Sequence, residues 1–571
     1  MKIQTFPAVK GNYHLDDYEE TVENFDWTQV EEQFTWFKTG KMNIAYEAID
    51  RHAESDKKNK IALYYKDADR REKYTFKDMS EKTNKAANVL KEIGVKKGDR
   101  VFIFMPRSPE LYFCLLGAIK LGAIVGPLFE AFMDAAVLDR LTDSEAKVLI
   151  ATPELIGRVD VVKLPNLEKI ALVGKNIEEN NKTIDFNTRF AKASNEFEIE
   201  WVSREDGMLL HYTSGSTGKP KGVLHAHNAM IQQYQTAKWV LDLKEDDVYW
   251  CTADPGWVTG TVYGVFGPWL HGVTNVVRGG RFNPEDWYKT IEEYEVTVWY
   301  SAPTAFRMLM GIGVELIERF DLSSLRHILS VGEPLNPEVV KWGVKVFQLR
   351  IHDTWWMTET GAMMICNYPC LTIKAGSMGK PIPGIEAAII DDRGNVLPPN
   401  KMGNLAAKMG WPSMMSGIWN KPEKYNEYFT HNGWYISGDS AYMDEDGYFW
   451  FQGRIDDVIN TSGERVGPFE VESKLLEHAA IAEAGVIGIP DPMRGMIIKA
   501  FISLREGYEE SDELKAEIQM FVKKELSAHS VPRQIQFRDK LPKTRSGKIM
   551  RRVLKAWELD LPTGDLSTMD D

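Results

Sequence analysis

The sequence predicts an α/β protein with a large, multi-layered N-terminal domain and a small α+β C-terminal domain. Through most of the chain, helical patterns alternate with short β-branched runs, which favours layers of helices around a mainly parallel sheet. From Gly433 onward the pattern changes to aromatic alternation around an EDG turn, which is typical of hairpins. A chain of 571 residues is long enough for both domains.

The N-terminal domain is expected to place amphipathic helices between buried strands. Residues 74–94 carry an apolar face at helical spacing, and the run RVFIFMP that follows is typical of a buried strand. The most apolar stretch, residues 111–129, contains Lys120, three glycines and a turn signal. It therefore predicts a buried helix and a strand rather than a membrane span of about 20 residues. Further strands are expected at 147–152, 169–174, 274–280 and 296–303.

The domain boundary is expected near residues 454–457, which divides the chain into residues 1–455 and 456–571. After it, the patterns predict helices over 468–479 and 511–526, strands over 483–489 and 498–504, and a basic tail. A segment of about 115 residues is large enough for a small α+β domain.

Composition excludes some classes of protein. The net charge of −14 argues against a general nucleic-acid binder, because such proteins need a positive field to displace counterions. The first residues contain no apolar run flanked by basic residues, so no signal peptide is predicted. Four cysteines in so long a chain indicate a reduced, cytoplasmic compartment. Cys366 and Cys370 lack a second Cys or His pair for zinc, and they are interpreted as ordinary thiols.

The strongest local signal is the segment YTSGSTGKPKG at residues 212–222, which follows the apolar run MLLH. Glycines let the backbone turn its N–H groups toward one point, while hydroxyls and lysines suit a polyphosphate. These residues are Gly215, Gly218 and Gly222, then Thr213, Ser214, Ser216 and Thr217, then Lys219 and Lys221. The spacing is not that of a Walker A loop. A flexible surface loop is the alternative, and the strand placement and two lysines favour phosphate binding.

This segment closely resembles the phosphate-loop signature of the adenylate-forming superfamily, which includes acyl-CoA synthetases, luciferases and the adenylation domains of peptide synthetases. Further signatures follow in the family's order: VGEP at 331–334, DTWWMTETG at 353–361, YISGD at 435–439, GRIDDV at 453–458 and KTRSGKIMRR at 543–552. The resemblance covers nearly the whole chain. It implies an adenylate-forming N-terminal domain, a mobile C-terminal lid and ATP-dependent activation of a carboxylic acid.

The resemblance also implies nucleotide contacts. A carboxylate beside a phosphate site commonly holds Mg²⁺, which makes Thr358 and Glu359 catalytic candidates. Asp439 can accept hydrogen bonds from both ribose hydroxyls, and Arg454 and Arg465 resemble further nucleotide contacts. The phosphate loop contributes Thr213, Ser214, Gly215, Ser216, Thr217, Gly218 and Lys221. The residues that resemble the family's adenine and α-phosphate wall are Gly332, Glu333, Pro334, Asp353, Thr354, Trp355, Trp356, Met357 and Thr358.

Lys548 is the candidate for the first chemical step. Adenylation brings a carboxylate to the α-phosphorus of ATP, and a desolvated ammonium that touches both relieves their repulsion. A basic surface patch or nucleic-acid tail is the alternative, which the net acidity opposes. Acetylation of Lys548 would remove the same charge, so a lysine acetyltransferase and a deacetylase are hypothesised partners.

Asp456 resembles the family's hinge, about which the C-terminal domain swings between two poses. One pose presents Lys548 for adenylation. The other presents Ser462 and Gly463 for thioester formation with CoA.

One aromatic residue points to acetate as the acid. The DTWW sequence at 353–356 resembles the same stretch of the family's acetate enzymes. The family's medium- and long-chain relatives carry smaller residues where Trp356 stands. By this match and that of WVTG at 257–260, a pocket for one methyl group is formed by Val258, Thr259, Val331 and Trp356. One methylene is worth roughly 1–3 kcal/mol, so propionate is expected to be a weaker substrate.

The sequence departs from the acetate type at several points. Met357 stands where those enzymes usually have Gln, and Thr261-Val262 replaces their His-Ser. The chain is also shorter before the phosphate loop, so the CoA contacts are candidates only: Thr259, Asn283, Ser462, Gly463 and Arg158. Leu476, His478 and Ile481 match positions whose backbone carbonyls can hold a second Mg²⁺.

Together these features predict a ligase that uses ATP, Mg²⁺, CoA and acetate. One rival is a CoA ligase for a slightly larger acid, which Trp356 opposes. Another is a catalytically dead nucleotide sensor, which the intact Lys548, Glu359 and Asp439 oppose. No nucleic acid and no membrane are expected among its partners.

Overall fold

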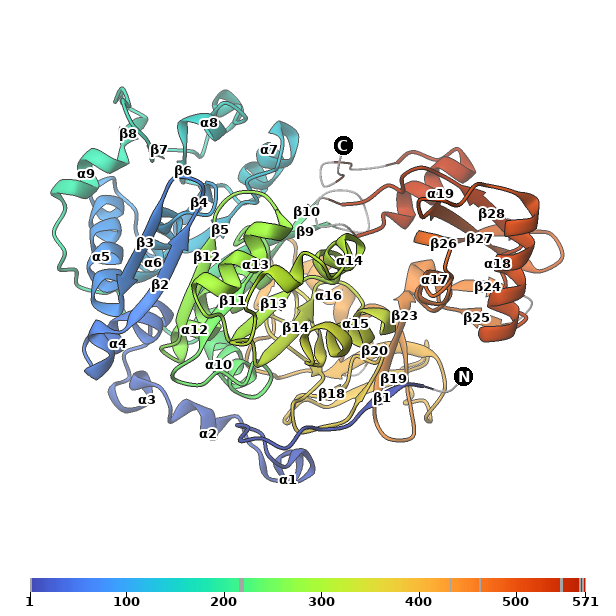
Figure 1. Cartoon of the computed structure of the whole chain (residues 1–571). Helices are drawn as coiled ribbons and strands as arrows, with labels where there is room; N and C mark the ends of the chain where they lie inside the picture. Colours follow the sequence, from blue (N-terminus) through green and yellow to red (C-terminus); the bar gives the residue numbers. More distant parts are fainter. Residues whose placement is uncertain are drawn as a thin grey trace.

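The computed structural model describes residues 3–214, 220–431, 433–461, 464–544 and 548–563, together with Leu566 and Met569. Figure 1 shows two parts of unequal size, with the last elements of the chain gathered at one side of a larger N-terminal domain. The large domain with a smaller C-terminal domain confirms the predicted fold class.

The first large sheet has eight strands in the order β21-β10-β9-β5-β4-β6-β7-β8. They are β4 (Arg100–Phe104), β5 (Ile124–Pro127), β6 (Val148–Ala151), β7 (Lys169–Leu172), β8 (Thr183–Asp185), β9 (Gly207–Ser214), β10 (Pro220–Ala226) and β21 (Gly417–Ile418). Pairing is parallel from β9 to β8 and antiparallel between β9, β10 and β21. β9 and β10 therefore form a hairpin around the predicted phosphate loop.

The second large sheet has nine strands in the order β18-β16-β15-β14-β13-β11-β12-β2-β3. They are β2 (Ile61–Lys66), β3 (Arg71–Thr75), β11 (Val248–Cys251), β12 (Thr274–Arg278), β13 (Val298–Ser301), β14 (His327–Val331), β15 (Ile351–Trp355), β16 (Ile365–Cys366) and β18 (Lys380–Pro381). Its central strands are parallel, so their carboxyl ends lie along one edge of the sheet. Two motif segments lie there, VGEP from the last residue of β14 and the Thr358–Glu359 turn after β15.

Helices cover these sheets. The two longest at the N-terminal end are α5 (Phe76–Glu92) and α6 (Pro109–Lys120). They pack closely because Gly117 has no Cβ, which would otherwise lie 2.8 Å from that of Ala86. A Thr75–Asp78 capping box fixes the start of α5. The others are α1 (Tyr18–Asn24), α2 (Thr28–Glu31), α3 (Thr35–Thr39), α4 (Arg51–Ala53), α7 (Asp134–Asp143), α8 (Pro153–Ile156), α9 (Phe186–Lys192), α10 (Met230–Trp239), α11 (Val258–Thr261), α12 (Gly267–Leu270), α13 (Pro284–Glu293), α14 (Pro303–Ile312), α15 (Pro337–Phe347) and α16 (Pro422–Asn426).

Two smaller sheets complete the N-terminal domain. A four-stranded antiparallel sheet contains β19 (Ala387–Ile390), β20 (Gly403–Lys408), β22 (Trp434–Met443) and β23 (Phe449–Arg454). The chain start, β1 (Thr5–Phe6), pairs with β17 (Ile373–Lys374). The hairpin of β22 and β23 confirms the prediction made from the EDG turn.

The C-terminal domain is built around a five-stranded sheet. Its strands are β24 (Ile459–Thr461), β25 (Glu464–Val466), β26 (Ile481–Asp491), β27 (Gly495–Leu504) and β28 (Gln534–Phe537), and its helices are α17 (Pro468–Leu476), α18 (Asp512–Glu525) and α19 (Arg551–Leu559). Its core is separate from those of the larger domain and is centred on β26, β27, α17 and α18. The mixed α+β composition agrees with the prediction.

The predicted elements are confirmed, including the buried helix and strand in residues 111–129. One feature differs: the larger domain contains two large sheets, where the alternation of elements predicted one mainly parallel sheet. Alternation gives the order of elements along the chain but does not say which strands pair. In the part of the chain that the structure describes, no helix has the length and apolarity needed to cross a membrane.

Candidate active site

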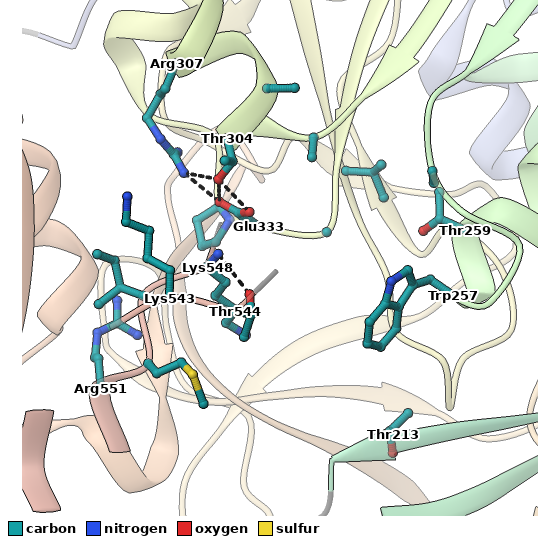
Figure 2. A pocket seen from close by; sticks show the side chains of 18 of the residues that line it. Thr213, Trp257, Thr259, Thr304, Arg307, Glu333, Lys543, Thr544, Lys548 and Arg551 are labelled. Carbon is teal, nitrogen blue, oxygen red and sulfur yellow. Dashed lines mark hydrogen bonds and ion pairs between the residues drawn. The ribbon is translucent and has the colours of Figure 1, made fainter. Parts of the chain in front are cut away.

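A large cavity lies between the two domains. It measures about 3420 Å³ and is lined by residues from both. Sites for one small molecule are typically about 300–1,000 Å³, so this space can hold several ligands at once. Figure 2 shows Lys543, Thr544, Lys548 and Arg551 of the C-terminal domain at one side of it, with Thr213, Trp257 and Thr259 across from them.

Most of the residues singled out from the sequence line this cavity. They are Arg158, Thr213, Lys221, Val258, Thr259, Val331, Gly332, Glu333, Pro334, Asp353, Thr354, Trp355, Trp356, Met357, Thr358, Glu359, Asp439, Arg454, Asp456, Leu476, His478 and Lys548. Asn283, Arg465 and Ile481 are not part of the lining. Gly215, Ser216, Thr217, Gly218, Ser462, Gly463 and the side chain of Ser214 lie outside the described residues.

Glu359 and Lys221 form an ion pair at the end of the phosphate loop. Lys221 Nζ lies 3.0 Å from Glu359 Oε1, and the hydroxyl of Tyr428 donates a hydrogen bond to the same oxygen at 2.9 Å. Lys221 also contacts the hydroxyl and ring of Tyr428. Burial of Glu359 opposes its ionisation, but the charge of Lys221 together with hydrogen bonds from Lys221, Tyr428 and the backbone lowers the pKa of the carboxyl. The site thus holds an ionised carboxylate beside the phosphate loop.

Asp439 is fixed from two sides. The indole of Trp355 donates to Oδ2 at 2.9 Å, and Arg454 donates to Oδ1 at 2.9 Å. Trp355 ends β15 of the nine-stranded sheet, whereas Asp439 and Arg454 face each other across the β22–β23 hairpin. The contacts join the two sheets and hold the carboxylate at the cavity.

The VGEP turn carries a second fixed carboxylate. Thr304 donates to both oxygens of Glu333, at 2.8 and 2.9 Å, and Arg307 donates to Oε2 at 2.7 Å (Figure 2). Nearby, burial raises the pKa of Asp353 to about 7, although its Oδ1 accepts a hydrogen bond from the backbone of Thr354. The wall predicted to hold the nucleotide therefore contains acidic groups in two different environments.

Lys548 reaches the cavity from the C-terminal domain, shortly before helix α19 (Arg551–Leu559). The backbone N–H of Lys548 donates to the Thr544 hydroxyl at 3.0 Å, and the N–H of Thr544 donates to the Lys548 carbonyl at 2.8 Å. Helix α19 begins three residues later at Arg551, which forms a bidentate contact with Glu472 of α17. These contacts fix Lys548 and the start of α19 to the rest of the C-terminal domain.

The surroundings of Lys548 make its ammonium easier to deprotonate. The side chain keeps contact with solvent in the cavity, but protein from both domains surrounds it, and this desolvation is the main reason that its pKa is lowered. Attraction to Asp439 opposes the shift, while Arg454 and Arg551 add to it and Glu333 opposes it. Charged groups of the larger domain therefore influence the pKa of Lys548, although Lys548 itself is part of the C-terminal domain.

The four residues predicted to hold the acid all line the cavity. Val258 and Thr259 begin the short helix α11, and Val331 and Trp356 follow or end neighbouring strands. Trp356 is 9% exposed, its indole N–H donates to the Tyr300 hydroxyl at 3.3 Å, and the Tyr263 ring meets it edge-on at 5.1 Å. These two contacts hold the indole in place at the wall of the cavity.

Asp456 lies in η8 (Ile455–Asp457), a single 3-10 turn between the last strand of the four-stranded sheet and the first strand of the C-terminal sheet. It is exposed and borders the cavity. This placement suits a hinge, and the exact domain boundary and the hinge role stay predictions.

The residues suggested for CoA and a second metal have other contacts. Asn283 is exposed and caps α13 through the N–H of Asp286, and Arg158 donates to the carbonyls of Glu130 and Phe132. The carbonyl of Ile481 accepts a hydrogen bond from the side chain of Arg505 at 2.9 Å. Among the described residues, no cluster of three or more His, Cys, Asp or Glu side chains could hold a metal. The CoA and second-metal roles stay predictions.

Sequence reasoning missed three residues of the site. Tyr428, Arg307 and Glu472 hold Glu359, Glu333 and the start of α19, respectively. Tyr428 and Arg307 stand in segments without a motif, so their own neighbours give no signal. Glu472 faces inward from α17, and a buried acidic residue on a helix is a signal of a charged partner.

The fold and this site define the class of protein: the chain belongs to the AMP-binding enzyme family. The family model for AMP-binding enzymes matches residues 49–419, and the model for the AMP-binding enzyme C-terminal domain matches residues 470–548. The acetyl-coenzyme A synthetase of Bacillus subtilis (strain 168) is 70% identical over 572 residues and covers 100% of both chains. That of Methanothrix thermoacetophila is 40% identical, covering 97% of this chain and 90% of the relative.

Solved structures agree with this membership. An acyl-CoA synthetase from Brucella canis superposes with a TM-score of 0.75 at 36% identity, covering 96% of this chain and 99% of the other. An anthranilate CoA ligase in complex with anthranoyl-AMP gives a TM-score of 0.82 at 31% identity, covering 90% of this chain and 97% of the other.

Proposed function

We propose that this chain is an AMP-forming acetate–CoA ligase. In the first step an acetate oxygen attacks the α-phosphorus of ATP, an O–P bond forms, and the bond to pyrophosphate breaks. In the second step the CoA sulfur, as thiolate, attacks the carbonyl carbon of acetyl-AMP, and AMP leaves as acetyl-CoA forms. Acetyl-coenzyme A synthetase relatives of full length support this activity.

The observation that carries the choice of acetate is the position of Trp356. Its indole is held by Tyr300 and Tyr263, so it cannot swing aside for a longer alkyl chain without breaking both contacts. Val258 and Val331 line the same cavity as Trp356, and the proposed methyl site lies beside these three side chains. Propionate is proposed as a weaker substrate, because one methylene changes binding by roughly 1–3 kcal/mol.

Residues at the phosphate loop fit a magnesium ion bound with ATP. Glu359 is ionised and held in place, and hard cations prefer such oxygen ligands. The hydroxyl oxygen of Thr213 is buried and has no hydrogen-bond partner among the described residues, so it is available to a phosphate or a metal-bound water. When bound, the ion would neutralise phosphate charge and support departure of pyrophosphate.

Lys548 is proposed to bring the two anions of the first step together. The backbone of Lys548 is bonded to Thr544 within the C-terminal domain. The pKa of its ammonium is influenced by Asp439 and Glu333 of the larger domain. Desolvation strengthens the attraction of an ammonium for both the carboxylate and the α-phosphate. We therefore propose that this pose serves adenylation and that thioester formation uses a second pose reached through Asp456.

Substrate preference tests the proposal directly. With ATP, Mg²⁺ and CoA present, AMP release is measured across straight-chain carboxylates from one to eight carbons. We expect the highest kcat/KM for acetate, a roughly 10–200-fold lower value for propionate and little activity with longer acids. A maximum at three or more carbons would transfer the proposal to the rival ligase for a larger acid. Formation of the CoA thioester without release of AMP would refute the proposed function.

Asp456→Pro is expected to separate the two half-reactions. Proline fixes φ near −65°, which matches the 3-10 turn that contains Asp456, so the pose with Lys548 in the cavity is retained. Acetyl-AMP formation should survive while transfer to CoA falls. Single-turnover assays of each half-reaction provide the measurement. Asp456→Ala is the matched control, since it removes the carboxylate but leaves φ free. Equal turnover of the Pro and Ala variants would place the hinge elsewhere.

Acetylation of Lys548 is proposed as an off switch, with a lysine acetyltransferase and a deacetylase as partners. The modification removes the charge that the first step needs. Protein acetylated homogeneously at Lys548 should lose turnover from ATP and acetate but still convert supplied acetyl-AMP and CoA. Full activity of the modified protein with ATP and acetate would end the idea.

A cytoplasmic location is also proposed. All four cysteines are free thiols, and three of them are buried. This usage is typical of proteins kept in a reducing compartment.

A further inference from the structure

A buried histidine links the two large sheets at the acid pocket. His211 lies on β9 of the eight-stranded sheet, two residues before Thr213 of the phosphate loop, and is 2% exposed. Its Nε2 lies 2.7 Å from the hydroxyl of Thr261, the last residue of α11. Helix α11 follows β11 of the nine-stranded sheet. One hydrogen bond therefore joins the module with the phosphate loop to the module with the acid pocket.

The hydrogen-bond chain has a defined direction. The Thr261 hydroxyl donates to the Val258 carbonyl at 3.0 Å, so its single proton is used there. With that proton on the Val258 side, we assign the His211 proton to Nε2, which donates to the Thr261 oxygen. Burial, and to a smaller degree His225, lowers the pKa of His211 to about 3, so the imidazole is neutral at physiological pH. A neutral ring with a proton on Nε2 makes this bond without introducing a buried charge.

Helix α11 packs tightly against the segment that leads into it. A Cβ at Gly260 would lie 2.1 Å from the carbonyl oxygen of Asp254, so the backbone already makes its closest approach there. Directly after Thr261 comes η5 (Val262–Phe266), whose Tyr263 meets Trp356 edge-on at 5.1 Å. A shift of α11 away from His211 would therefore displace Val258 and Thr259 and loosen the contacts that hold the indole.

We propose that His211 is a positioning residue that sets the size of the acid pocket by holding Thr261 and, through it, helix α11. This inference rests on the proposed function, because it concerns how the same site selects its acid. His211 acts on the acid through α11, and its effect should therefore fall on acid binding and selectivity. Binding of ATP depends on groups that stay in place when only the imidazole is removed.

Steady-state kinetics of four variants test the proposal. His211→Ala should raise KM for acetate about fivefold, the effect of one lost neutral hydrogen bond, and should lower the preference for acetate over propionate by a similar factor. KM for ATP should change less than twofold. His211→Gln places an amide N–H near the position of Nε2 and should restore most of the preference. Thr261→Val, which keeps the shape but removes the hydroxyl, should reproduce the loss, and combining it with His211→Ala should add little.

His327→Gln is the matched control. His327 is also a buried histidine on a strand and bonds through Nε2, to the Val240 carbonyl at 2.8 Å, but it does not line the cavity. It should lower the melting temperature without changing the preference between acids. The proposal is overturned if His211→Ala leaves that preference unchanged, or raises KM for ATP and acetate equally. If His211→Ala fails to fold, Thr261→Val decides by the same criteria.

The proposed function and this inference fail in different ways. A wild-type enzyme that activates neither acetate nor propionate would refute the function. The His211 experiment then compares the two best acids of the wild type, and an unchanged ratio between them would refute the positioning role alone.

Discussion

Replacing Lys548 with alanine is expected to lower the rate of acetyl-AMP formation by about 10²–10³-fold, the scale seen when one preorganised donor to a developing charge is removed. The side chain is influenced by charged groups of both domains, and its charge is the one proposed to let acetate approach the α-phosphate. The backbone of Lys548 is bonded to Thr544, and these hydrogen bonds remain after the substitution. The effect should therefore be chemical and not a loss of folding.

Thioester formation gives the internal control for this variant. When acetyl-AMP and CoA are supplied, Lys548→Ala should react within a few-fold of the wild-type rate, because the lysine serves the first pose only. Stopped-flow or quench measurements of the two half-reactions separate the effects. Equal losses in both would contradict the role assigned to Lys548. Lys555→Ala, at a partly buried position of α19, is a matched loss of positive charge at the cavity and should preserve more adenylation than Lys548→Ala.

Trp356→Gly is expected to move specificity from acetate to longer acids. Removing the indole opens a channel beside Val258 and Val331, and each added substrate methylene can be buried there at about 0.8 kcal/mol. Acetate should suffer at the same time, because its methyl group loses the wall against which it packs. The expected pattern is a crossover, with kcat/KM falling for acetate and rising for pentanoate or hexanoate.

The size of the deletion requires a check on folding. Truncating a buried tryptophan costs about 3–5 kcal/mol of stability, and Trp356 also gives up its contacts with Tyr300 and Tyr263. Thermal unfolding should be followed alongside kinetics, with Trp356→Leu as a milder variant that should favour acids of intermediate length. A uniform loss across all chain lengths, in both variants, would show that Trp356 is only part of the core.

Local structure was predictable because it depends on neighbours in the sequence. The apolar face of residues 74–94 and the turn signal in residues 111–129 each fix an element whose hydrophobic side must be buried. The same holds for the strand before the phosphate loop, since β9 ends at Ser214, where the glycine-rich segment begins. Motif residues could be assigned in order along the chain for this reason.

Contacts between distant segments could not be predicted in this way. Asp439 was expected to hold ribose hydroxyls, but its bonds to Trp355 and Arg454 depend on how two sheets meet. The contact of Tyr428 with Glu359 and that of His211 with Thr261 likewise join segments that carry no common pattern. Hydrophobic periodicity specifies which side of an element is buried but not which partner buries it, so the fine geometry of the site emerges only in the fold.

The most direct test of the central claim is acetate-dependent exchange of labelled pyrophosphate into ATP in the absence of CoA. The account predicts rapid exchange with acetate and Mg²⁺, slow exchange with propionate, and nearly none in Lys548→Ala. Exchange requires that acetyl-AMP and pyrophosphate form reversibly before CoA takes part. A wild-type enzyme that shows no exchange until CoA is added, or that releases ADP and phosphate in place of AMP and pyrophosphate, would contradict the adenylation mechanism.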